Sequence, residues 1–282
     1  MLDFFFKHYD GIVDRYVVFD DGSNDQTLDI LKKHHKVDLR RAPDLSKSED
    51  RILNSNVFQN NFWKESKEVA DWVLVVDVDE HLFHDDLRRY LIDCKRQGVT
   101  VVPTVGFEMV GEKYPPVTSR LCDVITYGAP SLLYSKPSIF SPKLIKDMHF
   151  SLGRHSASPE GRVVLPKKDE VLLMHYKHVD FDFVLRRHSE FLGRQSAKDL
   201  EKGYGFQYTW DAVQLRQAWD NIASRAIDVR QQQKARRAGR SKDHWWKTIE
   251  KSGFGQYETR LIRRKGLWGF IQGLINYRSL SI

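Results

Sequence analysis

The stretch Trp72-Val-Leu-Val-Val-Asp77-Val-Asp79-Glu80-His81-Leu-Phe decides how the fold of this chain is interpreted. Its apolar half is a short, continuous, valine-rich run, which is typical of a strand buried on both faces of a parallel sheet. The run leads directly into three carboxylates. Open α/β sheets bind ligands beyond the carboxyl ends of their strands, so these carboxylates lie where a ligand site is expected.

The acidic half of the stretch indicates a metal site. Asp77 and Asp79 are two residues apart, so on an extended backbone their side chains point the same way. Two adjacent carboxylates repel each other unless a cation or a shared proton offsets their charge. The simplest partner is a hard divalent ion such as Mg²⁺ or Mn²⁺, with phosphate oxygens as its other ligands. The alternative is a strand end whose carboxylates are solvated in a loop.

Length and composition suit a packed globular protein. The chain has 282 residues, of which 41% are hydrophobic and 12% aromatic, enough for one large α/β domain with an appendage. Cys94 and Cys122 are too few for a disulfide framework and are not grouped for a metal, so a reducing compartment is expected. No run approaches ~18 consecutive apolar residues, and the first residues do not resemble a signal peptide.

The net charge of +7 is concentrated near the end of the chain. Residues 225–265 hold thirteen Lys and Arg against four Asp and Glu, a net charge of +9, so the remainder carries −2. Residues 260–275 mix cations with large apolar side chains. This favours either an interfacial helix on anionic lipid or a terminal helix packed on the domain. No nucleic acid is expected as a partner, because no known binding module is recognisable.

Strands and helices alternate through the first hundred residues, which favours a parallel, doubly wound sheet. On it, the acidic clusters 20–25 and 77–80 would share one edge. Residues 103–170 are rich in Pro and Gly and are expected to be irregular, with short strands. A strand at 171–178 and a helix at 182–200 follow. In the first hundred residues we expect strands at 15–19, 37–41, 72–77 and 99–102, and helices at 2–10, 24–34, 49–70 and 87–98.

Two acidic motifs carry a resemblance to a known family. The first is Phe19-Asp20-Asp21-Gly22-Ser23-Asn24-Asp25-Gln26-Thr27, and the second, about fifty residues later, is the opening stretch. Together they resemble the family 2 glycosyltransferases with the GT-A fold, over roughly residues 3–210. Weaker likenesses are Gly106-Phe-Glu-Met, Tyr134-Ser-Lys-Pro-Ser-Ile-Phe-Ser-Pro, Gly153-Arg-His155 and Leu172-Leu-Met-His175-Tyr-Lys.

The resemblance implies a fold and an activity. The fold is α/β of the GT-A, Rossmann-like type: a doubly wound, mostly parallel sheet over residues 1–205, followed by a basic helical C-terminal extension over 206–282. The activity is metal-dependent, inverting transfer of a sugar from a UDP- or GDP-sugar to a glycan or other hydroxyl acceptor, in cell-surface polysaccharide synthesis. The expected location is cytoplasmic, with the basic tail as a peripheral contact to the inner face of the membrane.

The resemblance also assigns roles to residues. Asp20 and Asp21 match the positions that hold the nucleoside of the donor. Asp77 and Asp79 match the D-x-D motif, which contacts the ribose and a divalent Mn²⁺ or Mg²⁺. In the family a late histidine often completes the metal site. Inverting members use a carboxylate base, for which Glu108 is the leading candidate, with a surface glutamate as the alternative.

Four histidines are candidates for the late metal ligand, because neutral imidazole is a common ligand. His175 is the best placed, since it lies at the end of an apolar strand, and His155 is the reserve. For each histidine the alternative is a structural role. The candidates are His149, His155, His175 and His178.

The chain departs from the family pattern at its start. The family's domain begins with a strand that lines the nucleotide pocket, followed by a helix, whereas this chain begins inside that helix. The strand would lie between those at 16–19 and 72–77, so its loss would leave a gap in backbone hydrogen bonding. One interpretation is a truncated reading frame. The other is a non-catalytic relic that binds nucleotide weakly or not at all. A metal-dependent phosphotransferase or nucleotidyltransferase on a similar sheet is disfavoured, because no P-loop is present.

Overall fold

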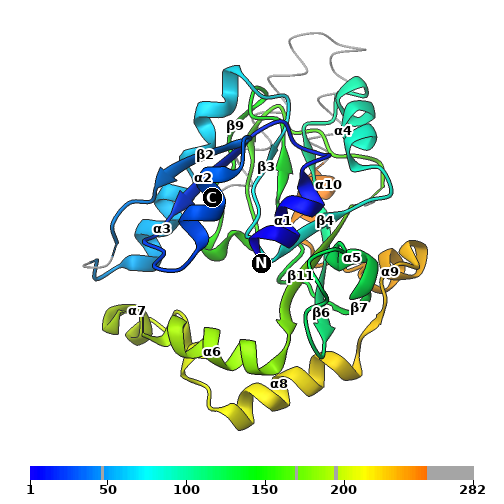
Figure 1. Ribbon diagram of the computed structural model, residues 1–282. Helices are drawn as coiled ribbons and strands as arrows, with labels where there is room; N and C mark the ends of the chain where they lie inside the picture. The colour runs from blue at the N-terminus through cyan, green and yellow to red at the C-terminus, as the bar shows by residue number, and fades with distance from the viewer. Residues whose placement is uncertain (46–47, 169–170, 194–195, 253–282) are drawn as a thin grey trace.

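The computed structural model describes residues 1–45, 48–168, 171–193 and 196–252. Within them the chain is an α/β protein whose strands form four sheets (Figure 1). The α/β class expected from the sequence is therefore present, but the sheets are mixed.

The largest sheet has five strands in the order β12-β7-β6-β11-β4. The two long strands β6 and β11 are parallel neighbours, whereas every other neighbouring pair in this sheet is antiparallel. Both strands are largely buried, as their apolar composition on both faces requires. The strands are β4 (Glu80–Phe83), β6 (Thr104–Gly111), β7 (Tyr127–Pro130), β11 (Val171–Val179) and β12 (Ile227–Asp228).

Three smaller sheets complete the strand pairing. In the first, β1 and β2 are parallel; in the second, β8 lies between β3 and β5 and is antiparallel to both; in the third, β9 and β10 are antiparallel. In the described part, β1 and β3 belong to different sheets, and the expectation of a missing strand between them stays a prediction. The strands are β1 (Tyr16–Asp20), β2 (Val37–Arg41), β3 (Val73–Leu74), β5 (Val101–Val102), β8 (Ile139–Phe140), β9 (Ile145–Asp147) and β10 (Glu160–Gly161).

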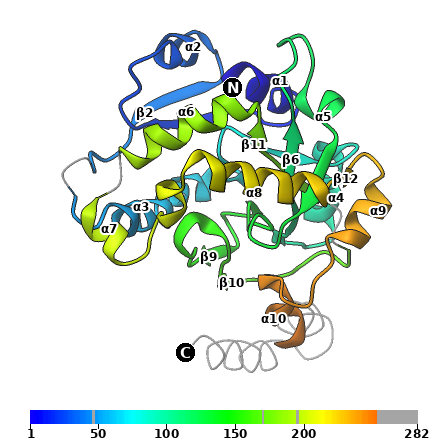
Figure 2. The same cartoon turned by 90° about the horizontal axis from the view of Figure 1, so that it is seen from below.

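The helices gather in groups around the sheets. Helices α6, α7 and α8 lie together below the sheets in Figure 1, and Figure 2 shows α6 and α8 side by side. None of the described helices is both long and apolar enough to cross a lipid bilayer. The α-helices are α1 (Leu2–Tyr9), α2 (Thr27–Lys33), α3 (Arg51–Gln59), α4 (Leu87–Arg96), α5 (Leu121–Val124), α6 (Phe181–Leu192), α7 (Ala197–Glu201), α8 (Ala212–Ser224), α9 (Gln232–Ala238) and α10 (Trp245–Ser252), and the 3₁₀ helices are η1 (Phe62–Glu68), η2 (Leu152–Arg154) and η3 (Phe206–Thr209).

The acidic stretch does not form the single parallel strand that was expected. Its apolar part forms β3, which is antiparallel to β8, and its last residues form β4 in a different sheet. Between them the chain turns, because the Glu80 carboxylate accepts a hydrogen bond from the N–H of Asp77 at 3.0 Å. The prediction of a doubly wound, mostly parallel sheet is therefore wrong about how the strands pair. Of the eight strand pairs in the described residues, two are parallel and six are antiparallel.

Two further expectations fail because of tertiary contacts. The helix expected over 49–70 is divided into α3 and η1 near Asn60, whose amide donates to the carbonyls of Asn56 and Phe150 at 3.0 and 3.2 Å. Such side-chain hydrogen bonds compete with the helical pattern. The segment 103–170, expected to be irregular, contains the central strand β6.

The predicted C-terminal extension packs on the main sheet as far as Trp246. Strand β12 extends the sheet by pairing with β7. Val229, Ala235 and Trp246 are fully buried in the same core cluster as Phe107 of β6. The boundary at residues 205 and 206 stays a prediction, and the segment 260–275, where a lipid-binding helix was considered, lies outside the described residues.

Gly106 allows a close approach between β6 and the loop that carries Tyr134. A Cβ atom at this position would lie 2.2 Å from the carbonyl carbon of Tyr134. Gly106→Ala is therefore expected to lower the free energy of unfolding by about 1–3 kcal/mol, measured by urea denaturation, because backbone atoms must shift. Gly11→Ala is the control, since its Cβ would meet nothing within 4 Å. Equal stability of Gly106→Ala and wild type would contradict this packing.

A buried histidine packs beneath β4. The Nε2–H of His8 donates to the carbonyl of Leu82 at 2.9 Å, and its ring stacks on His81 with centres 4.5 Å apart. Burial lowers the pKa of His8 to about 4 from 6.5; the Leu82 carbonyl and Asp123 oppose this, while Arg120 adds to it. On the other side of the ring, the Cys122 thiol lies 3.8 Å from Nδ1. The folded protein therefore favours neutral His8.

This shift predicts acid sensitivity. The stability that neutral His8 contributes is complete above pH 6.5 and is lost as the pH falls toward 4, because the unfolded chain takes up the proton first. The full loss is about 3 kcal/mol. Urea denaturation at pH 7.5 and 4.5 measures it, and His8→Gln should show a smaller difference between the two. The assignment is wrong if both proteins lose stability equally.

Candidate active site

Three polar residues form one row across the neighbouring strands β4, β11 and β6 of the five-stranded sheet. His175 of β11 lies opposite Glu80 of β4 on one side and opposite Glu108 of β6 on the other. Residues opposite each other on paired strands lie on the same face of a sheet. The row therefore places an imidazole between two carboxylates that are far apart in the sequence.

Asp79 meets this row from the turn that precedes β4. Its Oδ2 atom lies 3.5 Å from Nε2 of His175, and its carbonyl accepts a hydrogen bond from the N–H of Tyr176 at 2.8 Å. The His175 side chain is 7% exposed and packs against the ring of Tyr134, with ring centres 4.0 Å apart. Asp79 and His175, the two predicted metal ligands, are thus brought together.

The donor set fits a metal ion that phosphate helps to bind. A carboxylate and an imidazole suit Mn²⁺, and Mg²⁺ sites commonly combine one or two carboxylates with substrate phosphates. Within the described residues, no group of three His, Cys, Asp or Glu side chains could hold a metal. In the same residues, the buried Nδ1 of His175 has no hydrogen-bond partner. Asp79 and His175 are therefore two possible metal ligands, and an ion bound there would need its other ligands from water or from a phosphorylated molecule.

Asp77 is held by two cations. Its Oδ1 atom accepts a hydrogen bond from Nη2 of Arg154 at 2.6 Å, and its Oδ2 atom lies 3.5 Å from Nζ of Lys136. Lys136 also pairs with the fully buried Glu80 at 2.5 Å. Desolvation raises the pKa of Asp77, but the charges of Arg154 and Lys136 lower it by more. The net result is a pKa below the usual range of an aspartate. The Asp77 side chain remains 55% exposed, so a ligand can still reach it.

Glu108 is paired with a second histidine. Its Oε1 atom lies 3.2 Å from Nε2 of His178, and both side chains are largely buried. Desolvation raises the pKa of Glu108, whereas the hydrogen bond and charge of His178 lower it, and the net result is a lowered pKa. Glu108 is therefore ionised and oriented by an imidazole, so it can accept a proton, but its lowered pKa makes it a weaker base than a free glutamate.

The first acidic turn is stabilised by its own residues. Asp20 accepts hydrogen bonds from the N–H groups of Gly22 and Ser23 at 3.0 and 3.1 Å, and Gly22 has a φ of 83°. Asp21 pairs with Arg51 of α3 at 2.5 Å. Among the described residues, no hydrogen bond or ion pair joins this turn to Asp77 or Asp79. The structure therefore does not bring the two acidic motifs into direct contact.

The reserve histidine has a structural partner. The Nδ1–H of His155 donates to the carbonyl of Leu133 at 2.9 Å, and burial with the nearby charge of Lys136 lowers the pKa of His155 to about 4. His149 lies 3.5 Å from Glu160, on β10. His175 is thus the candidate histidine that contacts Asp79.

The sequence analysis missed the two buried cations. Lys136 and Arg154 lie within segments quoted for the family resemblance, next to the residues that received attention there. The charge of the acidic motif could have indicated them, because three carboxylates after a strand need cationic partners if they are not solvated. The sequence did not indicate which of its 45 Lys and Arg would supply them.

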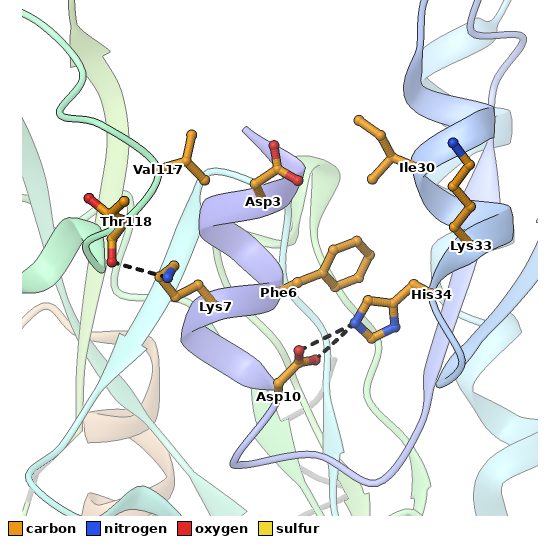
Figure 3. Close-up of a pocket in the computed structure, with 9 residues that line it drawn as sticks. All are labelled: Asp3, Phe6, Lys7, Asp10, Ile30, Lys33, His34, Val117 and Thr118. Carbon is orange, nitrogen blue, oxygen red and sulfur yellow. Dashed lines mark hydrogen bonds and ion pairs between the residues drawn. The ribbon is translucent and has the colours of Figure 1, made fainter.

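A separate cleft lies between α1 and α2, with a volume of about 670 Å³ (Figure 3). Asp10 pairs with His34 there at 3.2 Å, and Lys7 donates to the carbonyl of Thr118 at 3.0 Å. None of the D-x-D, Glu108 or His175 side chains lines it. The lining residues are Asp3, Phe6, Lys7, Asp10, Ile30, Lys33, His34, Val117 and Thr118.

Comparison with known proteins gives likenesses to solved structures only, and these include two crystal structures of S. aureus TarS. No protein-family model matches the sequence, and no curated protein is significantly similar to it. The crystal structure of S. aureus TarS 1-349 is 20% identical with a TM-score of 0.31, over 66% of this chain and 59% of that one. A second crystal structure of S. aureus TarS is 21% identical with the same TM-score, over 66% of this chain and 36% of that one. The chain thus spans less than two thirds of either TarS chain.

Proposed function

We propose that this protein is a metal-dependent glycosyltransferase that moves a sugar from a UDP- or GDP-sugar to a glycan or other hydroxyl acceptor. The observation that carries the proposal is the 3.5 Å contact between Asp79 and His175. His175 in turn lies opposite Glu108 on the neighbouring strand. The acidic motifs that resemble family 2 glycosyltransferases add to it. A role in cell-surface polysaccharide synthesis at the inner face of the membrane belongs to the same proposal.

In this proposal each site residue has a distinct task. Asp79 and His175 hold Mn²⁺ or Mg²⁺, which when bound would offset the charge of the donor diphosphate. Asp77, kept ionised by Arg154, accepts a hydrogen bond from the ribose. Asp20 and Asp21 hold the nucleoside.

Glu108 acts as the general base. It takes the proton of the acceptor hydroxyl, and the oxygen of that hydroxyl forms a bond to the anomeric carbon. The bond between that carbon and the phosphate oxygen breaks, and the electron pair leaves with the nucleoside diphosphate. His178 orients Glu108 through their 3.2 Å contact.

Calorimetry tests the proposal. We expect UDP or GDP to bind only in the presence of Mn²⁺ or Mg²⁺, and the matching nucleotide-sugar to release nucleotide slowly in water. A panel of UDP- and GDP-sugars, assayed for free UDP or GDP, identifies the donor. Absence of metal-dependent binding by either nucleotide would instead support the non-catalytic relic.

A further inference from the structure

Lys177 lies beside the proposed active site. It follows His175 by two residues in β11, where the register against β6 shifts between His175 and His178. Such bulges redirect side chains and are frequent next to active sites. The ammonium group of Lys177 lies 5.8 Å from the ring centre of Tyr208 in η3. Burial lowers the pKa of Lys177, and the nearby charges of Glu108 and Asp79 oppose this.

The cations around the acidic motif differ in their pairing. Arg154 is paired with Asp77, and Lys136 with Glu80 and Asp77. Lys177, although half-buried, has no hydrogen bond or ion pair to any residue in the described part of the chain. A partly desolvated ammonium group that makes no direct ion pair is unfavourable, and a bound anionic ligand can supply that contact.

We propose that the ammonium group of Lys177 binds the terminal phosphate of the donor's nucleoside diphosphate. This inference rests on the proposed function. Asp79 and Lys177 lie near enough for their charges to interact, so a diphosphate bound through a metal at Asp79 would extend toward Lys177. Lysine suits this task because its compact ammonium group carries three donors and a full charge, which phosphate oxygens accept.

In the transfer step Lys177 acts through its charge and neither gives nor takes a proton. As the bond between the anomeric carbon and the phosphate oxygen breaks, its electron pair stays on that oxygen. The negative charge that develops there is offset by the fixed positive charge of the ammonium group. Lys177 would therefore contribute both to donor affinity and to the rate.

The test compares nucleoside diphosphates with monophosphates. Lys177→Met should weaken binding of UDP or GDP, whichever the wild type binds with Mn²⁺, by about 10- to 100-fold, because a charge-assisted contact is lost. Binding of the matching UMP or GMP should change less than about 2-fold, because the terminal phosphate is absent. Lys177→Arg should recover most of the lost affinity. Lys113→Met, an exposed lysine after β6, is the control.

The outcomes separate this inference from the proposed function. If wild type binds neither UDP nor GDP, the proposed function fails and this inference fails with it. If wild type binds the diphosphate and folded Lys177→Met binds it equally well, the inference alone is overturned. Equal weakening of diphosphate and monophosphate also overturns it. Circular dichroism verifies folding, and Lys177→Gln takes the place of the methionine variant if that variant does not fold.

Discussion

Asp79→Asn is expected to abolish metal-dependent nucleotide binding and to lower nucleotide release from the sugar donor by on the order of 10³-fold. The reason is the distribution of charge in the site. Asp77 and Glu80 are already paired with Lys136 and, for Asp77, with Arg154. Asp79 faces His175, so it is the acid of this motif that is left to hold a divalent ion. An amide keeps the shape of the side chain and removes its charge.

The measurement is calorimetry with UDP and GDP, with and without Mn²⁺, followed by the nucleotide-release assay. Asp14→Asn is the matched control, because it removes a carboxylate whose side chain is 89% exposed and lies outside the row. Both variants should unfold at the same urea concentration as wild type. Mn²⁺-dependent binding by Asp79→Asn at wild-type affinity would show that the metal assignment is wrong.

Part of this site was predictable because its residues lie in or next to apolar strands. Asp79 and His175 were each assigned to the end of a strand from local apolar runs. The structure places His175 within β11, Glu108 within β6 and Asp79 in the turn before β4. The structure places Glu108 and His175 on adjacent strands and Asp79 against His175. Their chemical roles remain predictions.

The pairing of the strands was not predictable, because it depends on contacts between distant residues. The turn at Asp77 is stabilised by the side chain of Glu80, and it sends β4 into a sheet where it is antiparallel to β11. A periodicity of apolar residues does not indicate such a turn. The length of β6 was missed for a related reason: segment 103–170 was expected to be irregular because it is rich in Pro and Gly. Gly106 instead lies inside the strand and leaves room for the backbone of Tyr134, 28 residues away.

The two buried cations of the site were also not predictable, because they too depend on contacts between distant residues. Lys136 lies in a loop and Arg154 in η2, where its φ is 57°. Neither position has a spacing to the acidic motif that a sequence pattern could detect. Their charges pair with Asp77, so in the proposed site Asp79 is the aspartate of the D-x-D motif that is left for a metal.

Glu108→Gln is expected to lower nucleotide release by about 10²- to 10⁴-fold while leaving the affinity for nucleotide and Mn²⁺ unchanged. Glutamine keeps the shape of the side chain and a contact with His178, but it cannot accept the proton of the attacking hydroxyl. Nucleotide release and calorimetry are measured on the same preparation, with Glu112→Gln as the control, since Glu112 is exposed just after β6.

The two variants separate binding from chemistry. Asp79→Asn should lose both nucleotide affinity and turnover, whereas Glu108→Gln should lose turnover alone. Wild-type turnover by Glu108→Gln would show that Glu108 is not the base. Its 3.2 Å pairing with His178 would then be a structural contact. If Glu108→Gln instead loses nucleotide affinity as well, the carboxylate acts in donor binding, because a base that meets only the acceptor hydroxyl makes no contact with the nucleotide.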